Sequence, residues 1–91
     1  MKTTNFNTVN QLADVAAENK ASKYIAMARK FAEEASSIAA SIDSFFVKMA
    51  AREVNDSYQK AKSSNCEYTA YINAHAAEKW LEKISERVAQ N

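Results

Sequence analysis

The 91-residue chain contains no glycine and no proline, and it has only one cysteine and one histidine. Phosphate-cradling loops and dinucleotide-binding fingerprints need glycine for tight turns and close backbone approach, so the sequence excludes both kinds of nucleotide site. One cysteine cannot close an internal disulfide, and with one histidine it falls short of the three or four ligands of a zinc site. We therefore expect no metal, no cofactor and a reducing compartment, the cytoplasm.

The chain also lacks a strong charge of either sign and a long apolar run. Twelve basic and eleven acidic residues leave a formal charge of +1, so nothing attracts the whole chain to nucleic acid or anionic lipid. The most apolar stretch, residues 38–51, is interrupted by Asp43 and Lys48 and is shorter than the about 20 apolar residues that span a bilayer. Residues 1–8 lack the apolar run of a signal peptide. We expect no membrane span and no membrane partner.

Abundant alanine, glutamate and lysine are typical of helices, and the sequence predicts an all-α fold. We expect one domain over residues 1–91, a small bundle of three to four helices. The first helix is expected to begin at Thr8, because Thr8 and Gln11 have the spacing of a capping box, and to end near Asn19.

The clearest pattern predicts one long central helix over about residues 22–50. Apolar residues recur there at alternating spacings of four and three, which places them on one helix face. We call them the central row: Tyr24, Ala28, Phe31, Ala35, Ile38, Ile42, Phe45 and Met49. Four of them are expected to be buried against the last helix or a second copy of the chain, namely Phe31, Ile38, Ile42 and Phe45.

Beyond Met49 the apolar positions change phase, which predicts a bend or a break. Consecutive cap-forming residues at Asn55–Ser57 allow a break there, while a continuous helix to Lys62 is an equal alternative. The shifted apolar positions are Val47, Ala51, Val54, Tyr58 and Ala61.

A C-terminal helix is expected over about residues 65–89, after a boundary at Ser63–Asn65, with Ser64 and Glu67 as a second capping box. Its core-facing row repeats at spacings of four and three. That row is Cys66, Ala70, Ala74, Ala77, Leu81, Ile84 and Val88.

The opposite side of this helix is also apolar in its first half. Tyr68, Tyr71, Ile72 and His75 lie on that side, and no charge follows on it until Lys79. A helix that is apolar all round is normally covered on all sides. Tyrosine is also enriched among the residues that anchor protein interfaces. We therefore predict that these four residues bind a partner chain, with burial inside the bundle as the alternative.

The sequence argues against an enzyme. His75 is the one candidate base near neutral pH, but Cys66 lies on the opposite side of the same helix and cannot serve as its nucleophile. We expect Cys66 to be a small buried residue and Trp80 to belong to the core. Glu-x-x-His pairs, which helical-bundle metal sites use, are absent because Ile72 precedes His75 by three residues.

A second possible surface consists of Lys48, Arg52 and Tyr58, around the expected kink. The leading hypothesis is a non-enzymatic bacterial or phage protein that binds another protein through a helical surface, as an inhibitor, adaptor or chaperone. The alternative is a structural or regulatory homo-oligomer that contacts nucleic acid weakly through the kink near residues 48–62. Nucleic-acid binding is disfavoured, and a homodimer is favoured over a monomer because the chain is short and its apolar rows are long.

Overall fold

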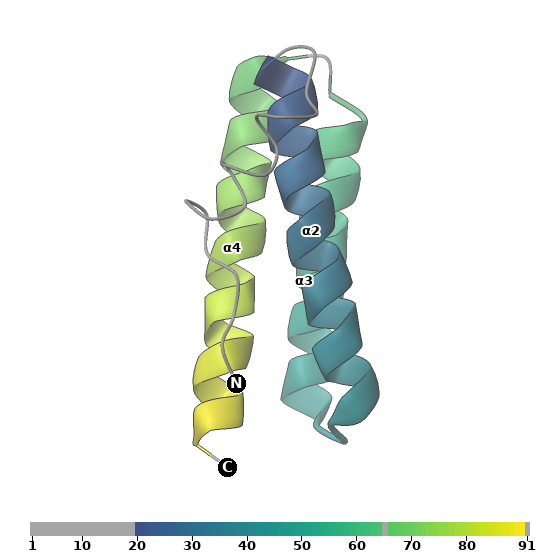
Figure 1. The fold of residues 1–91 in the computed structure, drawn as a ribbon, viewed down its shortest axis with the longest axis vertical. Helices are drawn as coiled ribbons and strands as arrows, with labels where there is room; N and C mark the ends of the chain where they lie inside the picture. Colours follow the sequence, from purple (N-terminus) through teal and green to yellow (C-terminus); the bar gives the residue numbers. More distant parts are fainter. Residues whose placement is uncertain (1–19, 65, 91) are drawn as a thin grey trace.

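The computed structural model describes residues 20–64 and 66–90, and these form three α-helices. They are α2 (Lys20–Ser41), α3 (Phe45–Lys62) and α4 (Glu67–Ala89), which together make up 90% of the described residues, with no strand among them (Figure 1). The all-α prediction is confirmed. The helix expected from Thr8 to Asn19, with its capping box, lies outside the described residues.

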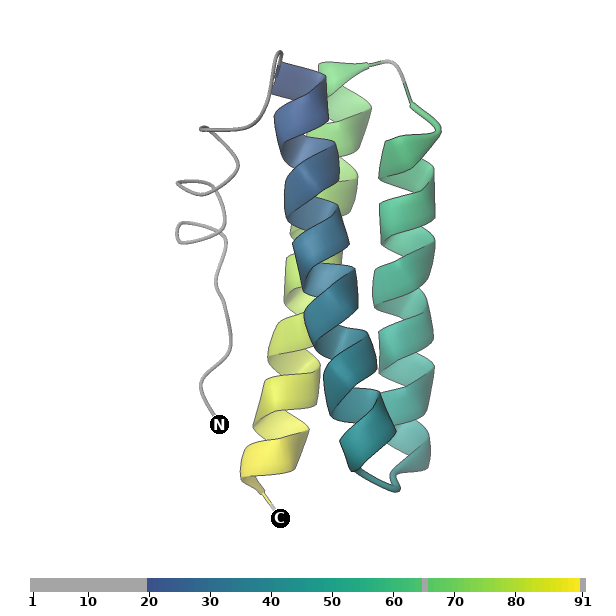
Figure 2. The same cartoon turned by 45° about the vertical axis from the view of Figure 1, so that its right-hand side comes forward.

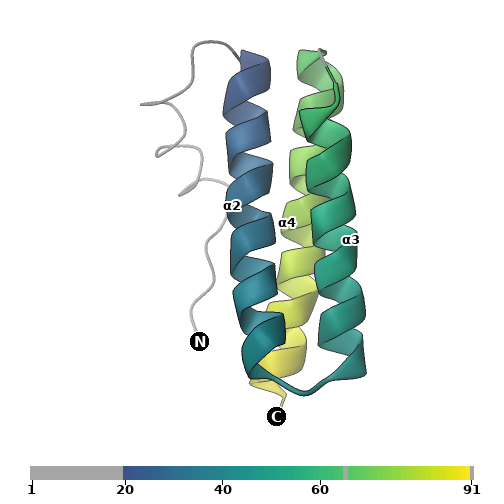
Figure 3. The ribbon, with the colours of Figure 1, turned by 90° about the vertical axis from the view of Figure 1, so that its right-hand side faces the viewer.

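The three helices run side by side along the long axis of the molecule (Figure 2). A short turn joins α2 to α3 at one end of the bundle, and the connection from α3 to α4 lies at the other end (Figure 3). α2 and α4 therefore run in the same direction and α3 runs opposite to both. As a result, the first turns of α2 and α4 lie at the same end of the bundle, although they are more than 40 residues apart in sequence.

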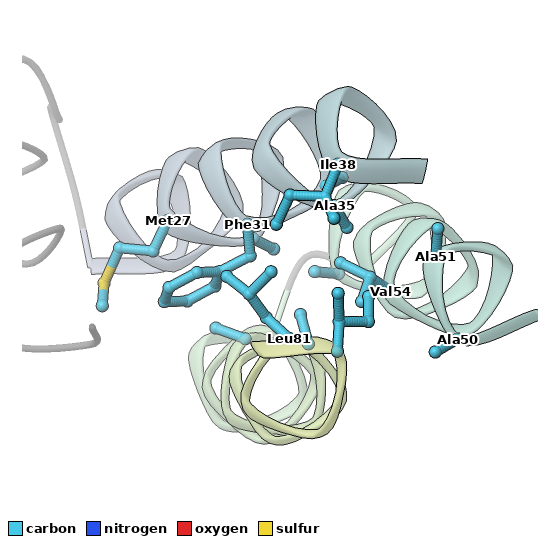
Figure 4. Packing of buried hydrophobic residues seen from close by; sticks show 14 of the residues in the cluster. Met27, Phe31, Ala35, Ile38, Ala50, Ala51, Val54 and Leu81 are labelled. Carbon is cyan, nitrogen blue, oxygen red and sulfur yellow. The ribbon is translucent and has the colours of Figure 1, made fainter. Parts of the chain in front are cut away.

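The core lies along the axis of the bundle, where each helix contributes one apolar row. Phe31 and Ile38 from α2, Val54 from α3 and Leu81 from α4 point into this space (Figure 4). Nine of the sixteen buried hydrophobic residues are alanines, which allow the helix backbones to approach closely. The core-facing row predicted for α4 is confirmed at Ala70, Ala74, Ala77, Leu81 and Ile84, all buried, with Val88 half-buried.

The predicted long central helix is wrong, because the chain leaves the helix at Ile42–Ser44. Ser44 takes an extended conformation as the N-cap of α3, and its hydroxyl accepts a hydrogen bond from the Val47 backbone N–H at 3.3 Å. The Ser41 hydroxyl donates to the Ile38 carbonyl at 3.0 Å. Short polar side chains that bond to the backbone compete with helix continuation, so this cluster ends α2 within the apolar pattern.

The break changes which residues of the central row are buried. Phe31 and Ile38 are buried as expected, but Phe45, the first residue of α3, is 82% exposed. Phe45 is therefore not buried against the last helix, and its burial by a second copy of the chain stays a prediction. The shifted row begins at Val47 and is buried there and at Ala51, Val54 and Ala61, with Tyr58 half-buried. The predicted change of phase is confirmed, and it arises because the shifted row lies on a separate helix, α3.

α3 continues without interruption from Phe45 to Lys62. Of the two alternatives, the continuous helix to Lys62 is confirmed and a break or kink near residues 55–57 is wrong. The boundary predicted at Ser63–Asn65 is also confirmed, since Ser63 is the C-cap of α3 and its hydroxyl donates to the Gln59 carbonyl at 3.0 Å.

The start of α4 differs from the expected capping box. Cys66, and not Ser64, is the N-cap of α4. The Ser64 hydroxyl accepts from the Cys66 backbone N–H at 3.0 Å, so Ser64 orders the turn before the helix. Because Cys66 precedes the first helical residue, its side chain is exposed, and the expectation that it is buried in the core is wrong.

Candidate functional site

The predicted partner-binding residues form one surface on the first half of α4, which we call the α4 patch: Tyr68, Tyr71, Ile72 and His75. Tyr68 is 69% exposed, Ile72 44% and Tyr71 37%. His75 is half-buried. The core contacts of this part of α4 are made by Ala70, Ala74 and Ala77. The bundle therefore leaves three of the four residues exposed, which disagrees with the alternative that they are internal.

Tyr71 is held in place by rings on both sides. Its ring centroid lies 5.1 Å from that of Tyr24 on α2, with the planes 72° apart. It lies 4.6 Å from the ring centroid of His75, one turn further along α4, at 77°. The Nδ1 atom of His75 lies 3.5 Å from a carboxylate oxygen of Glu78. These edge-to-face contacts fix the orientation of Tyr71, because such geometry is favoured between aromatic rings.

Beside the patch, an open hollow lies between the first turns of α2 and α4. It has a volume of about 450 Å³, and we call it the tyrosine hollow. Its lining residues are Tyr24, Cys66, Glu67, Tyr68 and Tyr71. Sequence reasoning missed Tyr24, Cys66 and Glu67 as members of this site. The spacing within each helix carried no signal for them, since the hollow exists only because α2 and α4 start at the same end of the bundle.

The thiol of Cys66 has a perturbed acidity. The pKa of this thiol is lowered, mainly by the backbone N–H of Thr69 and further by the Thr69 hydroxyl and the Tyr68 backbone N–H, which favour the thiolate. Burial and the nearby Glu67 carboxylate oppose this effect. The thiol therefore ionises at a lower pH than an ordinary cysteine.

The second surface proposed from sequence lies along the other side of the bundle, between α2 and α3. Lys48 and Arg52 line a hollow of about 520 Å³, and Tyr58 lines an adjoining one of about 490 Å³. Acidic groups accompany these cations: Lys48 Nζ lies 3.4 Å from Asp43, and Asp56 lines the same hollow as Arg52. The positive charge of this surface is therefore partly balanced.

Two further apolar side chains, Phe45 and Met49, are exposed near the α2–α3 turn, at the opposite end of the bundle from the tyrosine hollow. Trp80 is half-buried against the core, as expected, and Lys83 Nζ lies 4.5 Å from its ring centroid.

Comparison of the chain with protein-family models, curated proteins and solved structures found no match. Among residues 20–64 and 66–90, no three histidine, cysteine, aspartate or glutamate side chains gather as metal ligands would. None of the helices α2, α3 and α4 is long and apolar enough to cross a membrane.

Proposed function

We propose that this chain is a non-enzymatic, cytoplasmic bacterial or phage protein that binds another protein through the α4 patch, as an inhibitor, adaptor or chaperone. The proposal rests on one observation above all: Tyr68 and Ile72, one turn apart on α4, are 69% and 44% exposed, while alanines make the core contacts of the same turns. Large apolar side chains grouped on an otherwise well-packed helix are typical of a surface that another chain covers.

The packing of the patch supports this proposal on energetic grounds. Association costs free energy for each flexible side chain that becomes ordered. Tyr71 is already oriented by Tyr24 and His75, so little further conformational entropy is lost when a partner binds to it. Tyrosine has only two side-chain torsions and gives a large contact area, which makes it an effective anchor.

A second copy of the chain is the alternative partner, and a homodimer remains a prediction. Phe31 and Ile38 are buried within one chain, so they are not available to a dimer interface. Phe45 and Met49 are exposed and are the residues of the central row that a second copy could cover. Light scattering at micromolar concentration, with Phe45→Ser as the variant, distinguishes a dimer formed through this end from a monomer.

The partner-binding proposal is tested with a matched pair of double variants. Tyr68→Ala with Ile72→Ala removes two exposed apolar side chains from the α4 patch, whereas Phe45→Ala with Met49→Ala removes two from the other end of the bundle. Each tagged protein is used to capture partners from a lysate of the source cells, and captured proteins are quantified by mass spectrometry.

We expect a partner captured by the wild type to be lost with the patch variant and retained with the control, because truncating an interface anchor commonly costs about 2 kcal/mol or more. Both variants should melt close to the wild-type temperature, since their side chains are exposed. Full retention by a folded patch variant of every protein that the wild type captures contradicts the proposal.

A further inference from the structure

The tyrosine hollow has a composition that favours a cation. Three of its five lining residues are tyrosines and a fourth is the carboxylate-bearing Glu67, while no lining residue among those described carries a positive charge. A volume of about 450 Å³ lies within the range of pockets that hold small ligands, so the hollow is large enough for the end of one long side chain. It is open to solvent and adjoins Ile72 and His75 of the α4 patch.

Two of the three tyrosine rings of the hollow meet edge to face. Tyr24 and Tyr71 meet with their centroids 5.1 Å apart and their planes 72° apart, and Tyr68, which is 69% exposed, lies one turn of α4 before Ile72. The face of an aromatic ring is negative and attracts a cation within about 6 Å of its centroid. One such contact is already made at a ring of the hollow, since Lys23 Nζ lies 6.0 Å from the Tyr24 ring centroid.

The charge at the hollow supports the same ligand. Glu67 is exposed in the first turn of α4, where its carboxylate offsets the partial positive charge of the helix N-terminus. The pKa of the Cys66 thiol is also lowered, so this lining group becomes negative at a lower pH than an ordinary cysteine. An anionic group would be repelled by Glu67, and an apolar group would desolvate that carboxylate without pairing it.

We propose that the tyrosine hollow binds the guanidinium group of an arginine from the partner protein, stacked on the tyrosine rings and paired with the Glu67 carboxylate. Arginine fits this combination better than lysine, because its planar group stacks on aromatic faces and forms two parallel hydrogen bonds with a carboxylate. The inference rests on the proposed function and names the chemistry of the partner at one point of the interface. Lys23 is then an internal competitor for the ring of Tyr24.

The test uses small probes with the intact chain. N-acetyl-arginine methylamide is compared with N-acetyl-citrulline methylamide, which has nearly the same shape without the charge, and with the lysine analogue. Binding is followed by NMR at the backbone amides of residues 66–72 and at the ring protons of His75. His75 is the one histidine of the chain, and its ring packs against Tyr71, so its signal is unambiguous.

We expect saturable shifts with the arginine probe, a dissociation constant in about the millimolar range, and binding at least about fivefold tighter than that of citrulline. Glu67→Gln should weaken arginine binding several-fold, while Glu53→Gln, which removes the same charge from an exposed site on α3, should leave it unchanged. Lys23→Gln should strengthen it.

No saturable shift, equal binding of arginine and citrulline, or an unchanged affinity in Glu67→Gln overturns the inference, and tighter binding of the lysine probe overturns the choice of arginine. These results are separable from the proposed function. If the Tyr68→Ala, Ile72→Ala variant loses its partner but the arginine probe does not bind, only the inference fails. If the probe binds but that variant keeps its partner, the proposed function fails.

Discussion

Replacing Phe31 and Phe45 one at a time with alanine tests the architecture, because the same chemical change is made at two positions of the central row. Phe31 on α2 is fully buried and Phe45 at the start of α3 is 82% exposed. A buried phenylalanine cut back to alanine typically costs about 3 to 5 kcal/mol. Burying a whole phenylalanine side chain contributes about 1.5 to 3 kcal/mol, and Phe45 has lost only about a fifth of its accessible surface, so its replacement should cost about 0.5 kcal/mol or less.

The assay is urea denaturation followed by circular dichroism, with stability taken from the midpoint and slope. A chain of 91 residues is expected to have a free energy of unfolding of roughly 5 to 14 kcal/mol. Phe31→Ala will therefore remove a large fraction of the stability, and Phe31→Leu is included as a milder change in case the alanine variant does not fold.

Equal destabilisation by Phe45→Ala and Phe31→Ala would refute the break at Ile42–Ser44, because a continuous helix would bury both residues. Repeating the experiment at two protein concentrations separates this outcome from burial of Phe45 in a dimer. If the protein is a dimer, the urea midpoint depends on the protein concentration, whereas the midpoint of a monomer with a continuous helix is independent of it.

Two further predictions concern the N-caps of α3 and α4. Ser44→Ala removes the side-chain acceptor of the Val47 N–H and should lower the free energy of unfolding by about 0.5 to 2 kcal/mol, measured by the same denaturation; no change would show that Ser44 does not cap the helix. The rate of Cys66 alkylation should rise with pH, with a midpoint below pH 9.0, because the pKa of the thiol is lowered in the folded state. The thiolate therefore stabilises the fold above its unfolded-state pKa, and this contribution is lost as the pH falls through the folded-state pKa. Thr69→Val removes the hydroxyl and keeps the backbone N–H, which is the main cause of the shift, so it should move the midpoint only part of the way back toward 9.0. An unchanged midpoint would contradict the contribution assigned to the hydroxyl.

The sequence was sufficient for the helical class and for α4, because the apolar spacing of α4 is regular and its core row contains the residues that the structure buries. It was misleading at Ile42–Ser44. Ser41 and Ser44 lie outside the central row, where serine is compatible with a continuous helix, while the apolar spacing ran on to Phe45. The hydrogen bonds between these hydroxyls and the backbone outweighed the pattern, and apolar spacing alone does not report that competition.

The candidate site was predicted in part for a similar reason. Tyr68, Tyr71 and Ile72 could be found from one helix, since their exposure follows from their angular position on α4. Tyr24 could not, because it was assigned to the central row and its contact with Tyr71 depends on how α2 and α4 pack. Cys66 was assigned to the core because the predicted helix began before it. The helix begins at Glu67 instead, two residues later than predicted, and this leaves Cys66 exposed before the first turn.

The central claim is that the α4 patch is the surface through which this protein binds another protein. The most direct measurement is the dissociation constant of the purified partner for three proteins. They are the wild type, the double variant Tyr68→Ala, Ile72→Ala and the double variant Lys48→Ala, Arg52→Ala. We expect the α4 patch variant to bind at least about 30-fold more weakly, which corresponds to about 2 kcal/mol, and the Lys48 and Arg52 variant to change the affinity by less than about threefold. The opposite order would contradict the claim and place the working surface between α2 and α3.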